Sequence, residues 1–291
     1  MLAYADTGLR GKSTYACKPL TSHPAILKTT SFPSDWLRPA WPAPLSVQAV
    51  FTSRAGGVSA APYDSMNLGD HVGDQPADVQ GNRALLGRLL QAQPTFLQQV
   101  HGRAVVHLPT AEPAPIVADA SVSSQPGQAC TVMVADCLPV LFADTQGRAV
   151  AAAHAGWRGL LGQDGQGVLE ATYKEISTLA QAAPAAGAAE IIAWLGPCIG
   201  PQKFEVGPEV PAAFVAQQPE AAALFVPYKP GKWLADLPGL ARLRLQALGV
   251  RGIYGNDGSA DWCTVSNSLR FFSYRREPVC GRMAAAIWLR G

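Results

Sequence analysis

Two short apolar segments, residues 133–141 (MVADCLPVL) and 151–159 (AAAHAGWRG), constrain the fold of this chain most strongly. Apolar runs of this length are typical of β-strands buried inside a layered protein. Each run delivers one soft metal-ligand side chain, Cys137 and His154, into a turn. The fold must therefore bring a thiol and an imidazole to the ends of buried strands.

A third candidate ligand, His101, follows another apolar stretch in residues 98–102 (QQVHG). Two nitrogens and one sulfur make an incomplete tetrahedral shell, which is the arrangement that catalytic zinc requires. A buried Cys is also an ordinary core residue. Asp136 beside Cys137 favours a site, because an ionisable group at the end of a buried strand needs a partner such as a His N–H, an Arg or a metal. No CxxC pair or HExxH helix is present, so spacing alone does not identify the metal.

The hydrophobic pattern predicts an α/β (α+β) chain with more strands than helices. We expect strands at residues 46–52, 95–100, 104–108, 118–123, 131–135, 140–143, 149–153, 191–195, 251–254, 271–274 and 283–289. Helices are expected at residues 78–90, 167–183, 209–217 and 237–248. The alternation favours a single layered domain of mixed β-sheet with flanking helices. Residues 1–30 lack periodicity and are expected to be a loose N-terminal leader, with residues 31–291 forming one catalytic domain.

Composition excludes several classes of protein. Hydrophobic residues make up 48% of the chain and charged residues 15%, with a net charge of +2, which indicates a sizeable core and no nucleic-acid footprint. No apolar run reaches the length of about 18 residues that a membrane span needs. Six cysteines are too few for a disulfide scaffold, which suits reduced thiols and a cytoplasmic location. A monomer or a small homo-oligomer is expected.

A loop that follows the first expected strand has the features of an anion site. Residues 51–59 (FTSRAGGVS) place Arg54 just before two glycines, so backbone N–H groups and a guanidinium lie close together. A hairpin turn with a surface Arg explains the same pattern. Two further segments, residues 196–200 (GPCIG) and 273–277 (SYRRE), add a Gly/Pro turn suited to lining a pocket and two more arginines, Arg275 and Arg276.

Together these segments resemble one family, the YfiH-type laccase-domain proteins that have long been labelled multicopper polyphenol oxidases. The resemblance runs from about residue 35 to residue 289. The stretches that carry it, in chain order, are FTSRAGGVS, YDSMNLGDHVGD, QQVHG, ADASVS, VADCLPVLFAD, HAGWRG, LGPCIGP, FEVG and FFSYRRE with a following GR.

The resemblance implies a single α/β-type domain with a zinc ion held by two His and one Cys. Carried over by motif, these ligands are His101, Cys137 and His154, the three positions that the residues themselves indicate, and Cys137 is expected to be essential for catalysis. The family's activities are phosphorolysis of adenosine, inosine, guanosine and methylthioadenosine, together with adenosine deamination. The expected partners are purine nucleosides and phosphate.

Roles for the remaining candidates follow from the chemistry of phosphorolysis, in which phosphate attacks C1′ of the ribose as the purine leaves. Arg54 and Arg158 are expected to hold phosphate, because a guanidinium can contact two of its oxygens at once. Asp136 or Asp119 is expected to carry a proton or to orient a ligand imidazole. Asn67 is a candidate polar contact to the substrate.

The sequence is also compatible with three alternatives. A copper-dependent, laccase-like polyphenol oxidase would need a His-rich cluster, and the chain has five His in all. A single Cu²⁺ could still bind adventitiously at a His/His/Cys site. A hydrolase that edits peptidoglycan precursors has also been proposed for this family. The third alternative is a non-enzymatic binding module stabilised by zinc, although structural zinc usually has four protein ligands.

Overall fold

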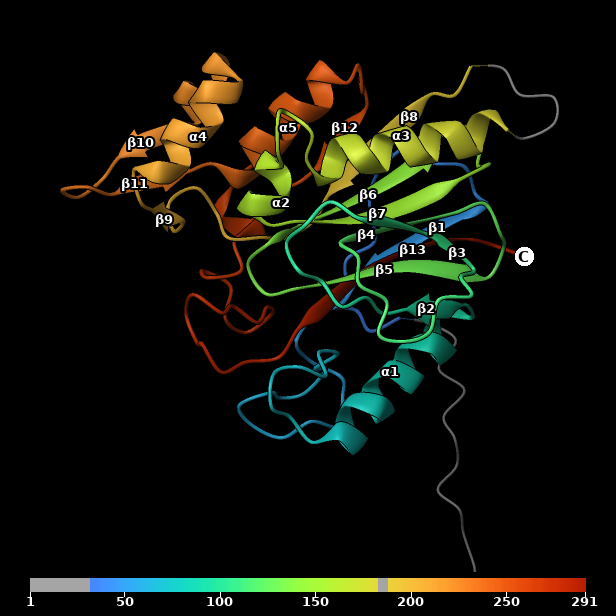
Figure 1. Cartoon of the computed structure of the whole chain (residues 1–291). Helices are drawn as coiled ribbons and strands as arrows, with labels where there is room; N and C mark the ends of the chain where they lie inside the picture. The colour runs from blue at the N-terminus through green and yellow to red at the C-terminus, as the bar shows by residue number, and fades with distance from the viewer. Residues whose placement is uncertain (1–31, 183–187) are drawn as a thin grey trace, which may run out of the picture. The chain divides into compact units, whose positions relative to one another are not determined.

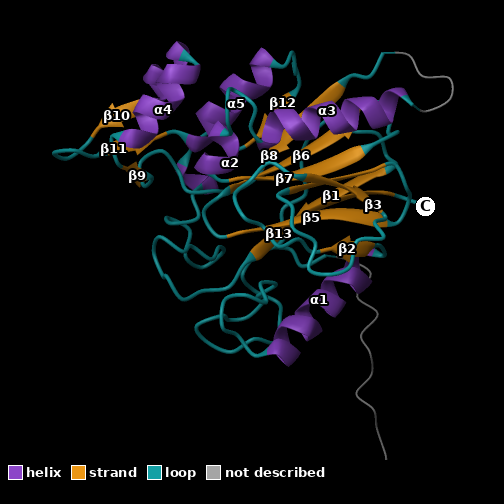
Figure 2. Ribbon diagram, in the orientation of Figure 1, coloured by secondary structure: helices purple, strands orange, loops and turns teal. Residues whose placement is uncertain are grey.

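The buried strands form two main sheets that pack against each other (Figures 1 and 2). In the computed structural model, residues 32–182 and 188–291 are described, and the leader predicted for residues 1–30 lies outside them. The larger sheet has six strands in the order β12 (Ile253–Gly255), β8 (Ile191–Leu195), β6 (Leu138–Asp144), β7 (Val150–Ala155), β4 (Ala120–Ser123) and β3 (Val105–Leu108). The second sheet has the order β1 (Val47–Phe51), β13 (Met283–Leu289), β5 (Gln128–Val134) and β2 (Gln93–Thr95).

Alternating side chains of the central strands supply two separate cores. On β6, Val140 and Phe142 pack toward α3 (Val168–Gln181) and α5 (Leu237–Ala247), while Leu141 packs toward the four-stranded sheet. Because successive side chains of a strand point to opposite faces, a strand covered on both faces must be apolar at every position. This requirement accounts for the uninterrupted apolar runs of the sequence.

The four-stranded sheet is covered on its outer face by α1 (Pro76–Leu90). Met133 of β5 packs in the same core as Leu86 and Leu90 of the helix, whereas its neighbour Val134 faces the larger sheet. The layers are therefore helix, sheet, sheet and helix (Figure 1). A third, small sheet of β10 (Phe225–Pro227), β11 (Trp233–Ala235) and β9 (Glu205–Val206) lies beside α4 (Glu209–Gln217).

The architecture confirms the predicted layered α/β domain of mixed sheets with flanking helices, although the strands divide between two main sheets. Helix α1 begins at Pro76, two residues before the predicted start, because a proline is favoured at the first helical position. None of the helices in the described ranges is long and apolar enough to cross a membrane.

Two predicted strands were wrong, and both lie near the site. The segment expected at residues 95–100 leaves strand geometry after Thr95, and the chain then runs as a loop to His101. Residues 271–274 form turns, although Phe271 and Phe272 are fully buried, so their apolar content reflects core packing. Sequence reasoning also missed the short helix α2 (Trp157–Leu161) and two short 3-10 helices, Pro219–Leu224 and Ala260–Trp262.

Candidate metal centre

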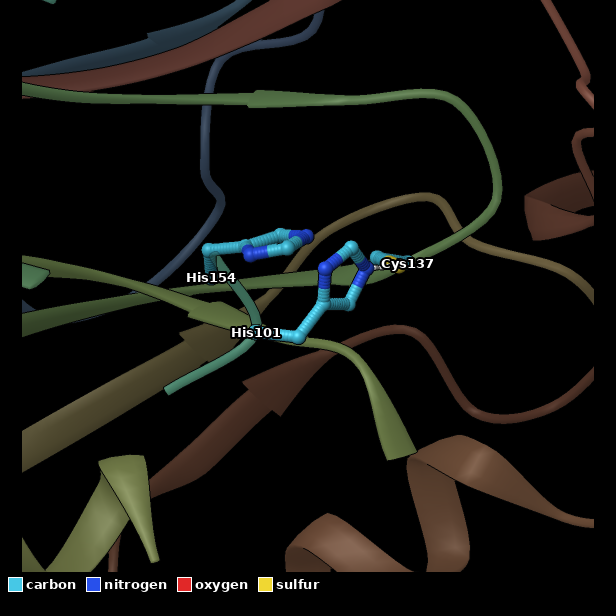
Figure 3. A group of neighbouring side chains, drawn as sticks. All are labelled: His101, Cys137 and His154. Carbon is cyan, nitrogen blue, oxygen red and sulfur yellow. Dashed lines mark hydrogen bonds between the residues drawn. The ribbon is translucent and has the colours of Figure 1, made fainter. Parts of the chain in front are cut away.

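Three chain segments bring His101, Cys137 and His154 together (Figure 3). His154 lies near the end of β7, and Cys137 immediately precedes β6, which pairs antiparallel with β7 so that Pro139 is opposite His154. The loop after β2 supplies His101. The ligand atoms of the three side chains all lie within 4.8 Å of one another. The structure therefore unites the three residues that the sequence predicted as metal ligands.

The three side chains have the ligand types of a metal site, and their arrangement leaves room for a further ligand. The Sγ of Cys137 lies 3.6 Å from Nε2 of His101, and the two imidazole rings meet edge to face with their centres 4.8 Å apart. His154 is buried, Cys137 is partly buried and His101 is exposed. Two imidazole nitrogens and a thiolate suit zinc, and a three-residue shell leaves a position open. The residues present therefore fit a catalytic zinc ion.

Two glycines of the HAGWRG segment allow the ligands to approach so closely. A Cβ atom on Gly156 would lie 2.7 Å from Cδ2 of His101 and 3.1 Å from the Sγ of Cys137. A Cβ atom on Gly159, in α2, would lie 2.9 Å from the carbonyl oxygen of Gly102. All three distances are shorter than ordinary van der Waals contacts of a Cβ atom. Glycine at these positions is thus a packing requirement of the cluster of His101, Cys137 and His154.

Asp119 lies behind the cluster and orients two of its members. Its fully buried carboxylate accepts hydrogen bonds from Nδ1 of His154 at 2.9 Å and from the main-chain N–H groups of His101 at 2.9 Å and Gly102 at 2.7 Å. Because a carboxylate only accepts, Nδ1 of His154 carries the proton and Nε2 is left for a metal. Burial opposes the charged form of Asp119, but the hydrogen bond and the charge of His154 hold its pKa below the usual value.

The two neighbouring histidines favour the thiolate form of Cys137 near neutral pH. Burial alone would raise the pKa of Cys137, but the charge of His154 and a hydrogen bond to His101 outweigh it and lower this pKa to about 6. Burial likewise opposes a charge on His154, yet the Cys137 thiolate and Asp119 raise the pKa of His154 to about 9. A thiolate is the form that binds a metal ion. By contrast, burial raises the pKa of Cys130 to about 12, which makes it an inert core thiol.

The cluster opens into a cavity of about 450 Å³. This volume is within the range of about 300–1,000 Å³ that is usual for small-molecule sites. Apolar and aromatic side chains contribute much of the wall. The acidic and basic lining residues other than the three clustered ones are His71, Asp136, Arg158, Arg275 and Arg282. A small, organic and anionic ligand suits such a lining.

Arg54 does not line this cavity. Its guanidinium donates to the carbonyl oxygens of Asp64 and Ser268, forms an ion pair with Asp64 at 3.4 Å, and lies over the ring of Phe272. These contacts fasten three loops together and leave the side chain only 15% exposed. The anion cradle predicted at residues 51–59 therefore gains no support from the position of Arg54.

The other predicted residues have different environments. Arg158 lines the cavity as an exposed side chain over the ring of Trp157. Asp136 also lines it, but its two carboxylate oxygens accept from Thr264 Oγ1 and from the main-chain N–H of Arg275, both at 2.6 Å. Asn67 is fully buried and does not line the cavity. A direct contact between Asn67 and a substrate therefore gains no support.

Sequence reasoning gave no role to two cavity residues, His71 and Arg282, and it noted Arg275 only as one of two arginines that add to the anion-site pattern. The signal for the arginines was present, because SYRRE and the following GR belong to the segments that carried the family resemblance. The Gly/Pro turn at residues 196–200 does reach the cavity as expected, through Ile199.

Curated relatives match nearly the whole described chain. A purine nucleoside phosphorylase of Pseudomonas aeruginosa is 50% identical over 257 residues, which cover 88% of this chain and 98% of that protein. The purine nucleoside phosphorylase YfiH of Escherichia coli is 50% identical over 259 residues, covering 88% and 99%. A purine nucleoside phosphorylase of Haemophilus influenzae is 46% identical over 256 residues, covering 87% and 98%.

Solved structures agree with these relatives. A Neisseria meningitidis protein of the DUF152 family superposes with a TM-score of 0.80 at 47% identity, covering 88% of this chain and all of that one. YlmD from Geobacillus stearothermophilus superposes with a TM-score of 0.72 at 30% identity, covering 85% and 93%. The family model described as multi-copper polyphenol oxidoreductase laccase matches residues 48–290. This chain therefore belongs to that family, the laccase-like group that includes the YfiH proteins.

Proposed function

We propose that this protein is a zinc-dependent purine nucleoside phosphorylase. The observation that carries the proposal is the convergence of His101, Cys137 and His154 on a cavity that arginines also line. The names of relatives at 46–50% identity support the same reaction. Adenosine, inosine, guanosine and methylthioadenosine are the proposed substrates, with phosphate as the co-substrate and adenosine deamination as a second activity.

In the proposed reaction an oxygen of phosphate forms a bond to C1′ while the bond from C1′ to the purine nitrogen breaks. The products are the free base and the sugar 1-phosphate, which is ribose 1-phosphate for adenosine, inosine and guanosine and 5-methylthioribose 1-phosphate for methylthioadenosine. His101, Cys137 and His154 would hold the zinc ion, which supplies Lewis-acid chemistry when bound. Asp119 keeps His154 in the ligating tautomer and fixes the loop that carries His101.

The cavity supplies the other requirements of the reaction. Arg158 is a cation at its wall, and no described residue forms a hydrogen bond or ion pair with its guanidinium. It is therefore available to an anionic co-substrate. Each carboxylate oxygen of Asp136 already accepts a hydrogen bond, one from Thr264 and one from the main-chain N–H of Arg275. We therefore assign this carboxylate the role of holding the Arg275 segment and not of transferring a proton.

A multicopper oxidase mechanism has less support. Such a relay needs several copper ions, each with its own His or Cys ligands. Within the described ranges, the group of His101, Cys137 and His154 is the one cluster of His, Cys, Asp and Glu able to hold a metal. His107 lies elsewhere, exposed and hydrogen-bonded to Glu175. The site thus offers ligands for one ion.

The test is release of base from each proposed nucleoside by zinc-loaded protein, with and without phosphate. We expect inosine to yield hypoxanthine only when phosphate is present, and adenosine to yield adenine and some inosine. H101A should abolish release, whereas H107A, which removes a His outside the cavity, should retain it. If the zinc-loaded protein releases no base from any of the four nucleosides, the proposed function is wrong.

A further inference from the structure

We propose that Arg275 and Arg282 form the phosphate subsite of the cavity, and that Asp136 and Asn67 hold these arginines in place through their main-chain N–H groups. The inference rests on the phosphorolysis proposed above and locates its anionic co-substrate. It transfers to Arg275 and Arg282 the role that the sequence pattern suggested for Arg54.

Both arginines present the same unoccupied edge. Nη1 of Arg275 donates to the carbonyl oxygen of Glu205 at 3.1 Å, and Nη1 of Arg282 donates to that of Cys280 at 2.9 Å. In each guanidinium, Nε and Nη2 have no hydrogen-bond partner among the described residues. Nε–H and an N–H of Nη2 are parallel donors that match two oxygens of one phosphate. A main-chain carbonyl thus anchors each side chain and leaves its bidentate edge available.

Aromatic rings of the cavity wall restrict both guanidinium groups further. Cζ of Arg275 lies 5.7 Å from the ring centre of Phe204, and Cζ of Arg282 lies 5.9 Å from that of Tyr274. Both rings also line the cavity. Contacts within about 6 Å attract a cation to the ring face and hold it in place. A prepositioned cation loses less side-chain entropy when an anion binds.

The charge of the cavity favours an anion. Asp136 is the one acidic side chain among its lining residues, and its oxygens already accept from Thr264 and Arg275. Three arginines of the same lining, Arg275, Arg282 and Arg158, carry positive charge. An oxyanion that carries one or two negative charges, such as inorganic phosphate, would balance the excess positive charge.

The main-chain N–H of each arginine donates a hydrogen bond to a buried side chain. Asp136, only 9% exposed, accepts the main-chain N–H of Arg275 at 2.6 Å. Asn67, fully buried, accepts the main-chain N–H of Arg282 at 2.9 Å through Oδ1 and donates to Asp74 through Nδ2. Asp136 and Asn67 are therefore positioning residues: they act on the anion through the arginines.

Neighbouring arginines lack these features. Arg276 donates from both terminal nitrogens to the carbonyl oxygens of Thr264, Val265 and Phe271, and it does not line the cavity. Arg54 is similarly engaged by Asp64 and Ser268. Engaged guanidinium groups thus mark Arg54 and Arg276 as structural, whereas Arg275 and Arg282 are both anchored by a main-chain carbonyl and available at one edge, a combination that Arg158 lacks.

The primary experiment is calorimetric titration of inorganic phosphate into zinc-loaded protein, together with the KM for phosphate and for inosine. We expect R275Q and R282Q each to weaken phosphate binding by at least about tenfold, since each removes a charge-assisted bidentate contact. The KM for phosphate should rise more than the KM for inosine. R88Q, an exposed arginine on α1, is the matched control and should bind phosphate as the wild type does.

The positioning role has its own variants. T264V removes the hydroxyl that holds Asp136, whereas T264S keeps it, so T264V should weaken phosphate binding and T264S should not. D136N should weaken it with zinc content unchanged. If D136N and T264V bind phosphate as the wild type does, or lose zinc together with phosphate binding, the positioning role is overturned.

The outcomes separate this inference from the proposed function. If the wild type binds phosphate through Arg275 and Arg282 but releases no purine base, the proposed subsite is supported and the proposed nucleoside reaction is wrong. If R275Q and R282Q bind phosphate as tightly as the wild type, the subsite is overturned even in an active enzyme. A dissociation constant above about 1 mM for inorganic phosphate and the zinc-loaded wild type would also overturn the proposed subsite.

Discussion

Asp119 and His154 form a buried pair in which the carboxylate accepts the Nδ1 proton of the imidazole at 2.9 Å. The same carboxylate accepts the main-chain N–H of His101, so one acid fixes two of the three candidate ligands. An arrangement of this kind sets the tautomer and the direction of the ligating nitrogen before a metal binds.

Replacement of Asp119 should therefore weaken metal binding without removing a ligand. We expect D119A to reduce zinc affinity by about 10- to 100-fold, in line with the loss of a group that orients a ligand. Competition with a chromophoric chelator measures the affinity. D78A, in the first turn of α1, serves as the control. Unchanged zinc affinity in folded D119A would contradict the orienting role.

Zinc binding should release protons in a pH-dependent way. Because the pKa of Cys137 is lowered to about 6 and that of His154 is raised to about 9, the metal-free pair between these values is a thiolate beside an imidazolium. A metal displaces the imidazolium proton, so this pair should release about one proton near pH 7.5, two well below pH 6 and none well above pH 9. Calorimetry in buffers of different ionisation enthalpy counts these protons. Release that does not change across this range would refute the ion pair.

The glycine that faces the ligands provides a steric test. In G156A the new Cβ would overlap Cδ2 of His101, so the ligands must move apart and zinc content should fall sharply. Gly81, inside α1, is the matched control, because its added Cβ meets nothing closer than 3.5 Å. Substitution of a helical Gly by Ala should stabilise the fold by roughly 0.5–1 kcal/mol. Full zinc occupancy in G156A would disprove the close packing of the centre.

A buried ion pair behind α2 provides a test of the fold. Arg244 donates to Glu170 at 2.7 Å and to the carbonyl oxygen of Gly165 at 2.9 Å, and both charged side chains are less than 10% exposed. Removing one partner leaves a buried charge, so R244A should lower the free energy of unfolding by about 3–5 kcal/mol. Urea denaturation measures the change. R251A, at an exposed arginine, should stay within about 0.5 kcal/mol of the wild type.

The sequence predicted the core strands and the candidate metal ligands because both depend on local patterns. Strands β6 and β7 are covered on both faces, so their uninterrupted apolar runs are visible in the chain itself, and so are Cys137 and His154 at the ends of these runs. Strand β13 was predicted with its observed bounds for the same reason.

What the sequence did not reveal depends on contacts between distant segments. Arg54 and Arg275 lie in similar Arg-containing loops, and only the fold shows that Asp64 and Ser268 engage the first while the second keeps a free edge. The misassigned strand at residues 271–274 has the same origin, since Phe271 and Phe272 are buried by tertiary packing without pairing to a strand.

In the proposed reaction, ribose passes from a purine to phosphate in the cavity beside His101, Cys137 and His154. The most direct measurement is ³¹P NMR of inosine and phosphate incubated with zinc-loaded protein. We predict ribose 1-phosphate in an amount equal to hypoxanthine, and loss of both products in C137A but not in H107A. Hypoxanthine formed with free ribose, or equal turnover in zinc-free C137A, would contradict phosphorolysis at this site.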